Sequence, residues 1–161
     1  MSDTRHDPVL GSGATPAEGP LGHLVVVFDN RIARSLTAIA DATGWEATLV
    51  DAAPVGDGLA ALGPVDALVV CNHDGDGAYA LLADALRAGV PYVAMMASRH
   101  RSAALLEQLR GEGLDDEQLG RLHVPAGLSI GGSSPGEIAL SVVAELVADA
   151  NGRPGTPMRA S

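Results

Sequence analysis

The stretch HLVVVFDNRIARSLTAIADATG, residues 23–44, contains the unit on which the predicted fold of this chain rests. Its first six residues, His23–Phe28, form an apolar run that is long enough for a buried strand and too short for a helix. Arg31–Thr43 follows with its large apolar side chains on one helical stripe, and Gly44 stands where a helix-terminating glycine is expected. A buried strand followed at once by such a helix predicts a parallel α/β sheet.

The same alternation of strands and helices continues along the chain. The sequence predicts further strands at Glu46–Asp51, Ala67–Cys71 and Tyr92–Met96, and further helices at Gly77–Ala88, Ser102–Arg110, Asp115–Arg121 and Pro135–Ala150. The last helix has the clearest start, because residues 134–137 combine an N-cap serine, a proline and the glutamate of a capping box. We therefore expect an open, mainly parallel Rossmann-like α/β sheet with helices on both faces and ligands bound beyond the carboxyl ends of the strands.

Length and composition favour one folded domain. The chain has 161 residues, of which 47% are hydrophobic, so it can bury a sizeable core. Proline and glycine are concentrated near both ends of the chain. We expect a flexible leader at residues 1–21, a Rossmann-type domain at 22–150 and a flexible tail at 151–161.

Charge and cysteine content narrow the function classes. The net charge is −10 and every one of the ten basic residues is arginine, so no concentrated positive face for nucleic acid is expected. Cys71 is the single cysteine, which excludes an intrachain disulfide and a cysteine-based zinc site, and no metal centre is predicted. No apolar run suits a membrane span or a signal peptide, so the expected location is the cytoplasm.

The first strand-to-helix turn contains Asp29, Asn30 and Arg31 and no glycine. A dinucleotide-binding fold has a glycine-rich loop here, because only glycine lets the backbone approach a pyrophosphate. Asp29 would also repel a phosphate, although Arg31 could partly offset that repulsion. The alternative is that Asp29 or Asn30 caps the helix. Asp51 ends the second strand, 22 residues after Asp29, where an acidic residue can bind a ribose or be a solvated turn residue.

The loop after the third strand is the strongest candidate for chemistry. Asn72, His73 and Asp74 lie there, and the pair His73 and Asp74 could exchange a proton with a substrate. The alternative is a polar turn in which Asp74 or Asp76 caps the next helix. Cys71 is expected to be a small buried residue rather than a nucleophile.

Two later loops could bind an anion. Ser98, Arg99 and Arg101 precede a predicted helix, where arginines and free amides suit a phosphate, or else they form a solvated helix start. Gly127 and Gly131 punctuate the loop before the last helix, which is either an anion cradle or a connection that needs positive φ.

Four stretches of the chain carry a family resemblance: DALVVCNHD (66–74), GVPYVAMMASR (89–99), PAGLSIG (125–131) and PGEIALSVVAE (135–145). From the third strand onward the chain thereby resembles the C-terminal Rossmann domain of the XdhC/CoxI family of maturation factors for molybdenum hydroxylases. In this family the last two stretches follow the patterns PxGLxIG and PxEIAxSIxAEI. Residues 24–51 match its first βαβ unit more loosely, so the resemblance covers residues 22–150.

Three departures from the family pattern bear on function. The N-terminal domain with a cofactor-handling cysteine has no counterpart in residues 1–21. The first turn is glycine-free and one residue short, and Ala97 stands where the family has the glycine of Gly-Ser-Arg. The resemblance implies a stand-alone accessory factor that binds molybdopterin, NAD(P), another nucleotide or a partner protein, with His73, Asp74, Ser98, Arg99 and Arg101 as expected contacts.

Three functions remain open from the sequence. The first is the maturation factor, a chaperone-like protein partnered by a molybdenum hydroxylase or by a separate protein with the missing N-terminal domain. The second is a small NAD(P)-dependent oxidoreductase with His73 as its acid–base residue. The third is a ligand-free module whose last helix packs on a partner or on a second copy, as in a homodimer. A binding or maturation role is expected rather than an enzymatic one.

Overall fold

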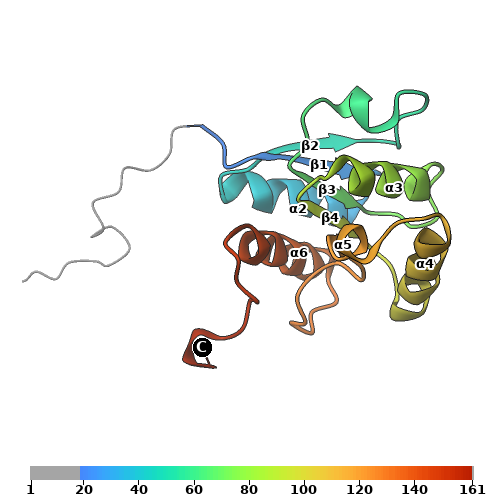
Figure 1. Ribbon diagram of the computed structural model, residues 1–161. Helices are drawn as coiled ribbons and strands as arrows, with labels where there is room; N and C mark the ends of the chain where they lie inside the picture. The colour runs from blue at the N-terminus through green and yellow to red at the C-terminus, as the bar shows by residue number, and fades with distance from the viewer. Residues whose placement is uncertain (1–18, 161) are drawn as a thin grey trace, which may run out of the picture.

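The computed structural model describes residues 19–160 and forms one α/β unit (Figure 1). Its strands are β1 (His23–Val27), β2 (Glu46–Val50), β3 (Ala67–Val70), β4 (Tyr92–Met95) and β5 (Leu122–His123). Its helices are α2 (Arg31–Ala42), α3 (Ala78–Ala88), α4 (Arg99–Gly111), α5 (Asp116–Leu119) and α6 (Pro135–Ala150), with 3₁₀ turns η1 (Gly58–Leu62) and η2 (Met158–Ala160). The predicted leader lies outside the described residues except for its last three positions.

The five strands form one parallel sheet in the order β2-β1-β3-β4-β5. The chain runs outward from β1 to β2 at one edge, then crosses back to β3 on the other side of β1 and continues to β5. The strand order therefore reverses between β1 and β3, and open α/β sheets bind ligands beyond the carboxyl ends of the strands at such a switch point. The predicted Rossmann-like fold is confirmed.

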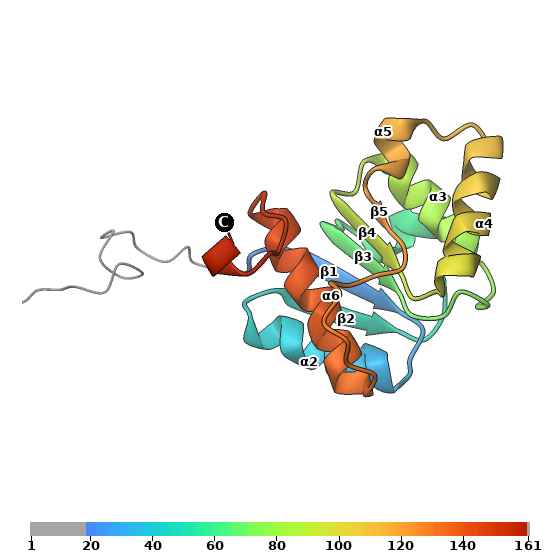
Figure 2. The ribbon, with the colours of Figure 1, turned by 90° about the horizontal axis from the view of Figure 1, so that it is seen from below.

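Helices cover both faces of the sheet, as Figure 2 shows. On one face α2 and α6 pack side by side over alternate residues of the strands, such as Leu24, Val26 and Val69. On the other face α3, α4 and α5 pack over the intervening residues, such as Val25, Leu68 and Met95. The central strands β1, β3 and β4 are buried on both faces, which is why their sequences are continuously apolar.

The structure corrects several predicted boundaries. Helix α4 begins at Arg99 rather than Ser102, because the Ser98 hydroxyl caps it by accepting from the Arg101 amide at 3.1 Å. Neither Asp74 nor Asp76 caps α3, whose N-cap is Gly77 in a left-handed conformation. The two-residue strand β5 lies where the sequence predicts a loop. Strands β1 to β4 each end one residue earlier than predicted.

Within residues 19–160, no helix is long and apolar enough to cross a membrane. The segment after α6 runs back toward the loop that precedes this helix. The approach is close, because a β-carbon on Gly155 would lie 3.0 Å from a methyl carbon of Leu128.

Candidate functional site

The candidate site is the edge of the sheet at which the strands end. The loops that follow β1, β2, β3 and β4 all meet there, because parallel strands point their carboxyl ends the same way. The sequence places its candidate residues Asp29, Asn30, Arg31, Asp51, Asn72, His73, Asp74, Ser98, Arg99 and Arg101 in these loops or in the first turn of the helix that follows each of them.

The first turn is occupied by its own side chains. The Asn30 side-chain oxygen accepts from the Ala33 amide at 2.9 Å and caps α2, while its amide nitrogen donates to the Cys71 carbonyl at 3.1 Å. Asp29 is paired with Arg34 through bonds of 2.7 and 3.0 Å, and these hydrogen bonds lower the pKa of the Asp29 carboxyl. Asp29 is therefore paired with Arg34, and the exposed Arg31 takes no part in this ion pair.

A dinucleotide does not fit this turn in the usual way. Its pyrophosphate would need free amides at the start of α2, but the Asn30 cap uses the Ala33 amide and the Asp29 carboxylate lies beside the turn. The turn also lacks the glycines that allow close approach of a phosphate.

Phe28 carries the backbone strain of the turn. It is the one non-glycine residue between 19 and 160 with positive φ, +77°, a conformation that β-substituted residues adopt reluctantly. Its ring lies on Gly75 so closely that a β-carbon there would be 2.3 Å from the ring. The glycine-free turn thus places an aromatic side chain over the loop that follows β3.

The loop after β3 brings three predicted residues together. His73 Nε2 lies 3.2 Å from Asp74 Oδ2, and the Arg101 guanidinium donates to Asp74 Oδ1 at 3.2 Å. The Asn72 side chain holds the loop by accepting from the Asp74 amide at 3.0 Å. His73 therefore has a carboxylate partner, as proton exchange needs, and Arg101 is partly neutralised by the same carboxylate.

The other predicted residues lie apart from this group. The side chains of Arg31, Asp51 and Arg99 are exposed and form no hydrogen bond or ion pair with the described residues. Gly127 and Gly131 have φ of +104° and +82°, as a glycine-dependent connection requires. Gly127 is not free to cradle an anion, because its amide donates to Glu145 at 3.0 Å.

Glu145 ends the stretch PGEIALSVVAE (135–145) that the sequence analysis singles out, and it is the centre of a network of contacts. Its carboxylate accepts from the Tyr92 hydroxyl at 2.8 Å and the Gly127 amide, and it lies 3.4 Å from His123 Nδ1. Tyr92 and His123 stack with their ring centroids 4.5 Å apart, and His123 Nε2 is 3.7 Å from Asp149. The glutamate of α6 thereby ties the glycine loop to β4 and β5.

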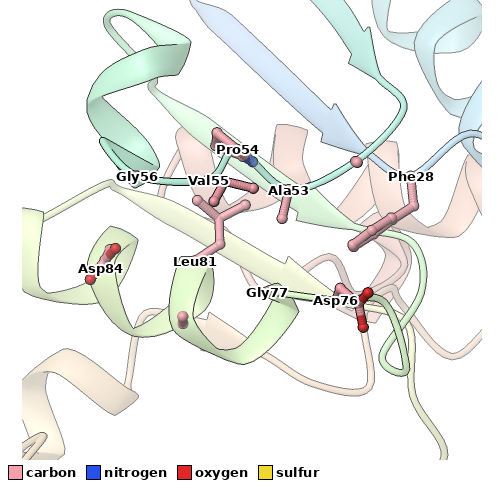
Figure 3. A pocket seen from close by; sticks show the side chains of 12 residues that line it. Phe28, Ala53, Pro54, Val55, Gly56, Asp76, Gly77, Leu81 and Asp84 are labelled. Atoms are coloured by element: carbon pink, nitrogen blue, oxygen red, sulfur yellow. The ribbon is translucent and has the colours of Figure 1, made fainter.

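A cavity of about 650 Å³ opens between the loop after β2 and the first turns of α3 (Figure 3). Its apolar wall includes Phe28, Ala53, Val55 and Leu81, and carboxylates of Asp76 and Asp84 also line it. The cavity lies beside β1 and β3, at the switch in strand order, and its volume suits a small molecule. Among the residues that line the cavity, only Phe28 and Asp76 belong to the loops that the sequence marks as candidate sites.

Cys71 belongs to the core rather than to the site. Its side chain is buried at the end of β3, and burial raises the pKa of the thiol to about 12. The prediction of a small buried residue is confirmed. Among residues 19–160 there is no group of three or more His, Cys, Asp or Glu side chains able to hold a metal ion.

The parallel sheet, its strand order and the helices on both faces define a Rossmann-type α/β domain. The chain belongs to the XdhC Rossmann domain family, whose model matches residues 24–146. It is 41% identical over 66 residues to the uncharacterized protein YqeB of Escherichia coli, an alignment that covers 41% of this chain and 12% of YqeB.

A solved structure has the same fold. It is a Bacillus halodurans protein described as a xanthine dehydrogenase, with a TM-score of 0.66 and 21% identity. The similarity covers 87% of this chain and 45% of that one, so this chain spans less than half the length of either relative.

Proposed function

We propose that this protein is an accessory factor in the maturation of a molybdenum-cofactor hydroxylase. The observation that carries the proposal is the match of the XdhC Rossmann domain model to residues 24–146. The similarity to a protein described as a xanthine dehydrogenase supports the same class of client enzyme. The factor would act by binding a small molecule or a client segment at the strand-end edge, where the cavity lies.

The features of this edge favour a binding role over an enzymatic one. The first turn does not fit a pyrophosphate, which removes the main support for an NAD(P)-dependent oxidoreductase. For the anionic molybdopterin, Arg99 offers an exposed guanidinium without a partner in residues 19–160, whereas Arg101 is already paired with Asp74. Any phosphate of a bound cofactor would therefore meet Arg99 before Arg101.

Maturation of the hydroxylase in a host that lacks the chain tests this proposal. In a host that lacks the chain, the client hydroxylase should contain less molybdenum and lose activity, and the wild-type chain should restore both. Val55→Trp, which places a ring at the cavity mouth, should restore less. Ala38→Trp, on the exposed side of α2, should restore as much as the wild type. Full molybdenum content in the absence of the chain would contradict the proposal.

A second candidate function is assembly through α6. Leu140 and Val147 are 49% and 37% exposed and, with Ala144 between them, form an apolar stripe at helical spacing. Such a stripe supports packing against a second copy, so we propose a homo-oligomer. Leu140→Glu should then reduce the mass measured by light scattering, while Ala38→Glu should leave it unchanged. A monomeric wild-type chain would rule this out.

A further inference from the structure

The end of α6 carries the one Asn-Gly pair of the chain. Asn151 is the C-cap of α6, and Gly152 follows it with φ of +66°. The other two asparagines, Asn30 and Asn72, are followed by an arginine and a histidine. Asparagine is thermolabile because the backbone nitrogen of the next residue can attack its side-chain amide, and glycine has no side chain to shield that nitrogen. This chemistry singles out Asn151 among the three asparagines.

Both reacting groups lie at the surface but are held by hydrogen bonds. Asn151 and Gly152 are exposed. The Asn151 side-chain nitrogen donates to the Val147 carbonyl at 2.7 Å, and the Gly152 amide donates to the Asp149 carbonyl at 3.0 Å. The attacking nitrogen is thus engaged with the helix while the cap is closed. Helix ends fray, so these two bonds open far more often than bonds in the core.

The same turn directs the chain after α6. The Arg153 amide donates to the Ala148 carbonyl at 2.8 Å, so the backbone turns back directly after Gly152. The segment that follows reaches the loop before α6, where Gly155 has φ of +81° and a β-carbon on it would lie 3.0 Å from a methyl carbon of Leu128. The contact between Gly155 and Leu128 therefore depends on the geometry of the α6 C-cap.

We infer that Asn151 is a site of spontaneous deamidation, and that isoaspartate at this position releases the segment after α6 from Leu128. When the cap opens, the Gly152 nitrogen bonds to the side-chain carbonyl carbon of Asn151. The bond from that carbon to the amide nitrogen breaks, and this nitrogen leaves as ammonia with the proton of the Gly152 amide. Water then opens the resulting succinimide ring at either carbonyl, which gives aspartate or isoaspartate. The inference does not depend on the proposed function.

Isoaspartate cannot form the turn that Asn151 forms. Its backbone runs through the side-chain carbons and contains an extra methylene group, so the two amides that follow no longer meet their carbonyl acceptors in α6. Its free carboxylate also lies at the negative end of the helix dipole, next to the exposed Asp149. Aspartate keeps the backbone but has no hydrogen to donate to the Val147 carbonyl.

Mass spectrometry of the full chain, incubated in neutral buffer at physiological temperature, tests the modification. After tryptic digestion Asn151 lies in the peptide 122–159, which contains no other asparagine or glutamine. This peptide should gain the mass difference between an amide and an acid and separate chromatographically into isoaspartate and aspartate forms. Asn30 and Asn72 are internal controls, and their peptides should stay unchanged over the same period.

Denaturant separates the chemistry from the protection that the cap gives. In concentrated guanidinium chloride the conversion should be roughly tenfold faster than in native buffer, because the bonds that hold both reacting groups are broken. Asn151→Gln should stay unconverted in both solutions, since its longer side chain would have to close a larger, slower-forming ring.

Methyl NMR signals of Leu128 test the release of the segment. The isolated isoaspartate form should show shifted Leu128 signals, as should Gly155→Trp, which places a ring where only a hydrogen fits. Asn151→Asp should move the signals less, because its backbone still forms the turn.

Three results would overturn the inference: conversion of Asn151 no faster than that of Asn30 and Asn72, conversion in native buffer as fast as in guanidinium chloride, or unchanged Leu128 signals in the isoaspartate form. The first refutes the modification site, the second refutes protection by the cap, and the third refutes release of the segment. None of them depends on the hydroxylase, so the maturation experiment is judged separately.

Discussion

The Tyr92 hydroxyl in β4 donates to the Glu145 carboxylate in α6 over 2.8 Å, a contact between residues 53 positions apart in sequence. Tyr92 is 1% exposed, and burial raises the pKa of its phenol well above the ordinary value. The phenol therefore stays protonated and remains a donor to Glu145. This pair fixes α6 against the sheet at the point where the glycine loop also attaches.

Removal of the Glu145 side chain should destabilise the fold. Glu145→Ala leaves the Tyr92 hydroxyl and the Gly127 amide without their acceptor, which should lower the free energy of unfolding by about 2–4 kcal/mol. Urea unfolding measures the change. Glu107→Ala, on an exposed position of α4, should cost less than about 0.5 kcal/mol. Equal costs for the two variants would show that the network contributes little.

The contribution of Glu145 should depend on pH. Burial raises the pKa of Glu145, but bonds from His123, Gly127 and Tyr92 outweigh this and leave it below its ordinary value of 4.5. Because the pKa is lower in the folded state, the stabilisation is fully present above the unfolded value and is lost as pH falls through the folded value. The stability difference between wild type and Glu145→Gln should be constant near pH 7 and shrink below about pH 4.5.

Two neighbouring groups, His123 and Asp149, also face the cluster. Because His123 contacts Glu145 directly, the Glu145→Gln variant changes the surroundings of His123 as well. A difference that grows as pH falls would contradict the direction assigned to Glu145.

The contact between Phe28 and Gly75 should be intolerant of added volume. A β-carbon at Gly75 would lie 2.3 Å from the Phe28 ring, so Gly75→Ala should lower the free energy of unfolding by about 1–3 kcal/mol. Phe28→Leu in the same chain should recover part of this loss. As a control, Gly136→Ala meets no atom within 4 Å and should be neutral or stabilising. If Gly75→Ala were as stable as the wild type, the Phe28 ring could not lie as close to Gly75 as described.

Cys71 should be unreactive in the native protein. Its thiol is buried and has a pKa raised to about 12, so at pH 8 it is almost entirely protonated and shielded. A coloured disulfide reagent should react slowly in buffer and within seconds in concentrated urea. Because the chain has one cysteine, the reaction reports on this position alone. Rapid native labelling would show that the end of β3 opens readily.

The sequence predicts most of the fold because its signals are local. The apolar runs at β1, β3 and β4, the Asn30 cap and the Ser134 capping box each lie within a few residues. The sequence predicts the start of α4 three residues late, at Ser102, because its first turn, Arg99–Arg101, is polar and its apolar periodicity begins only at Leu105. Strand β5 has two residues, too few to show a period.

The candidate site was predictable only in part. His73 and Asp74 are adjacent in sequence, so their pairing needed no tertiary information, but Arg101 reaches Asp74 from the first turn of α4. The cavity is assembled from segments around residues 28, 53, 76 and 81, and its small apolar side chains carry no chemical signature. Nothing local marks Asp84 as a cavity residue, because on its own helix it resembles any solvated acid.

Asn30 links two loops that the sequence keeps 41 residues apart, since its oxygen holds the Ala33 amide while its nitrogen holds the Cys71 carbonyl. Aspartate could replace only the first bond, because a carboxylate has no hydrogen to give. The Asn30 side chain therefore joins the loop after β3 to the start of α2. If the loop after β3 loosens, we expect the Ala33 amide to exchange faster with solvent, because the same side chain accepts its hydrogen bond.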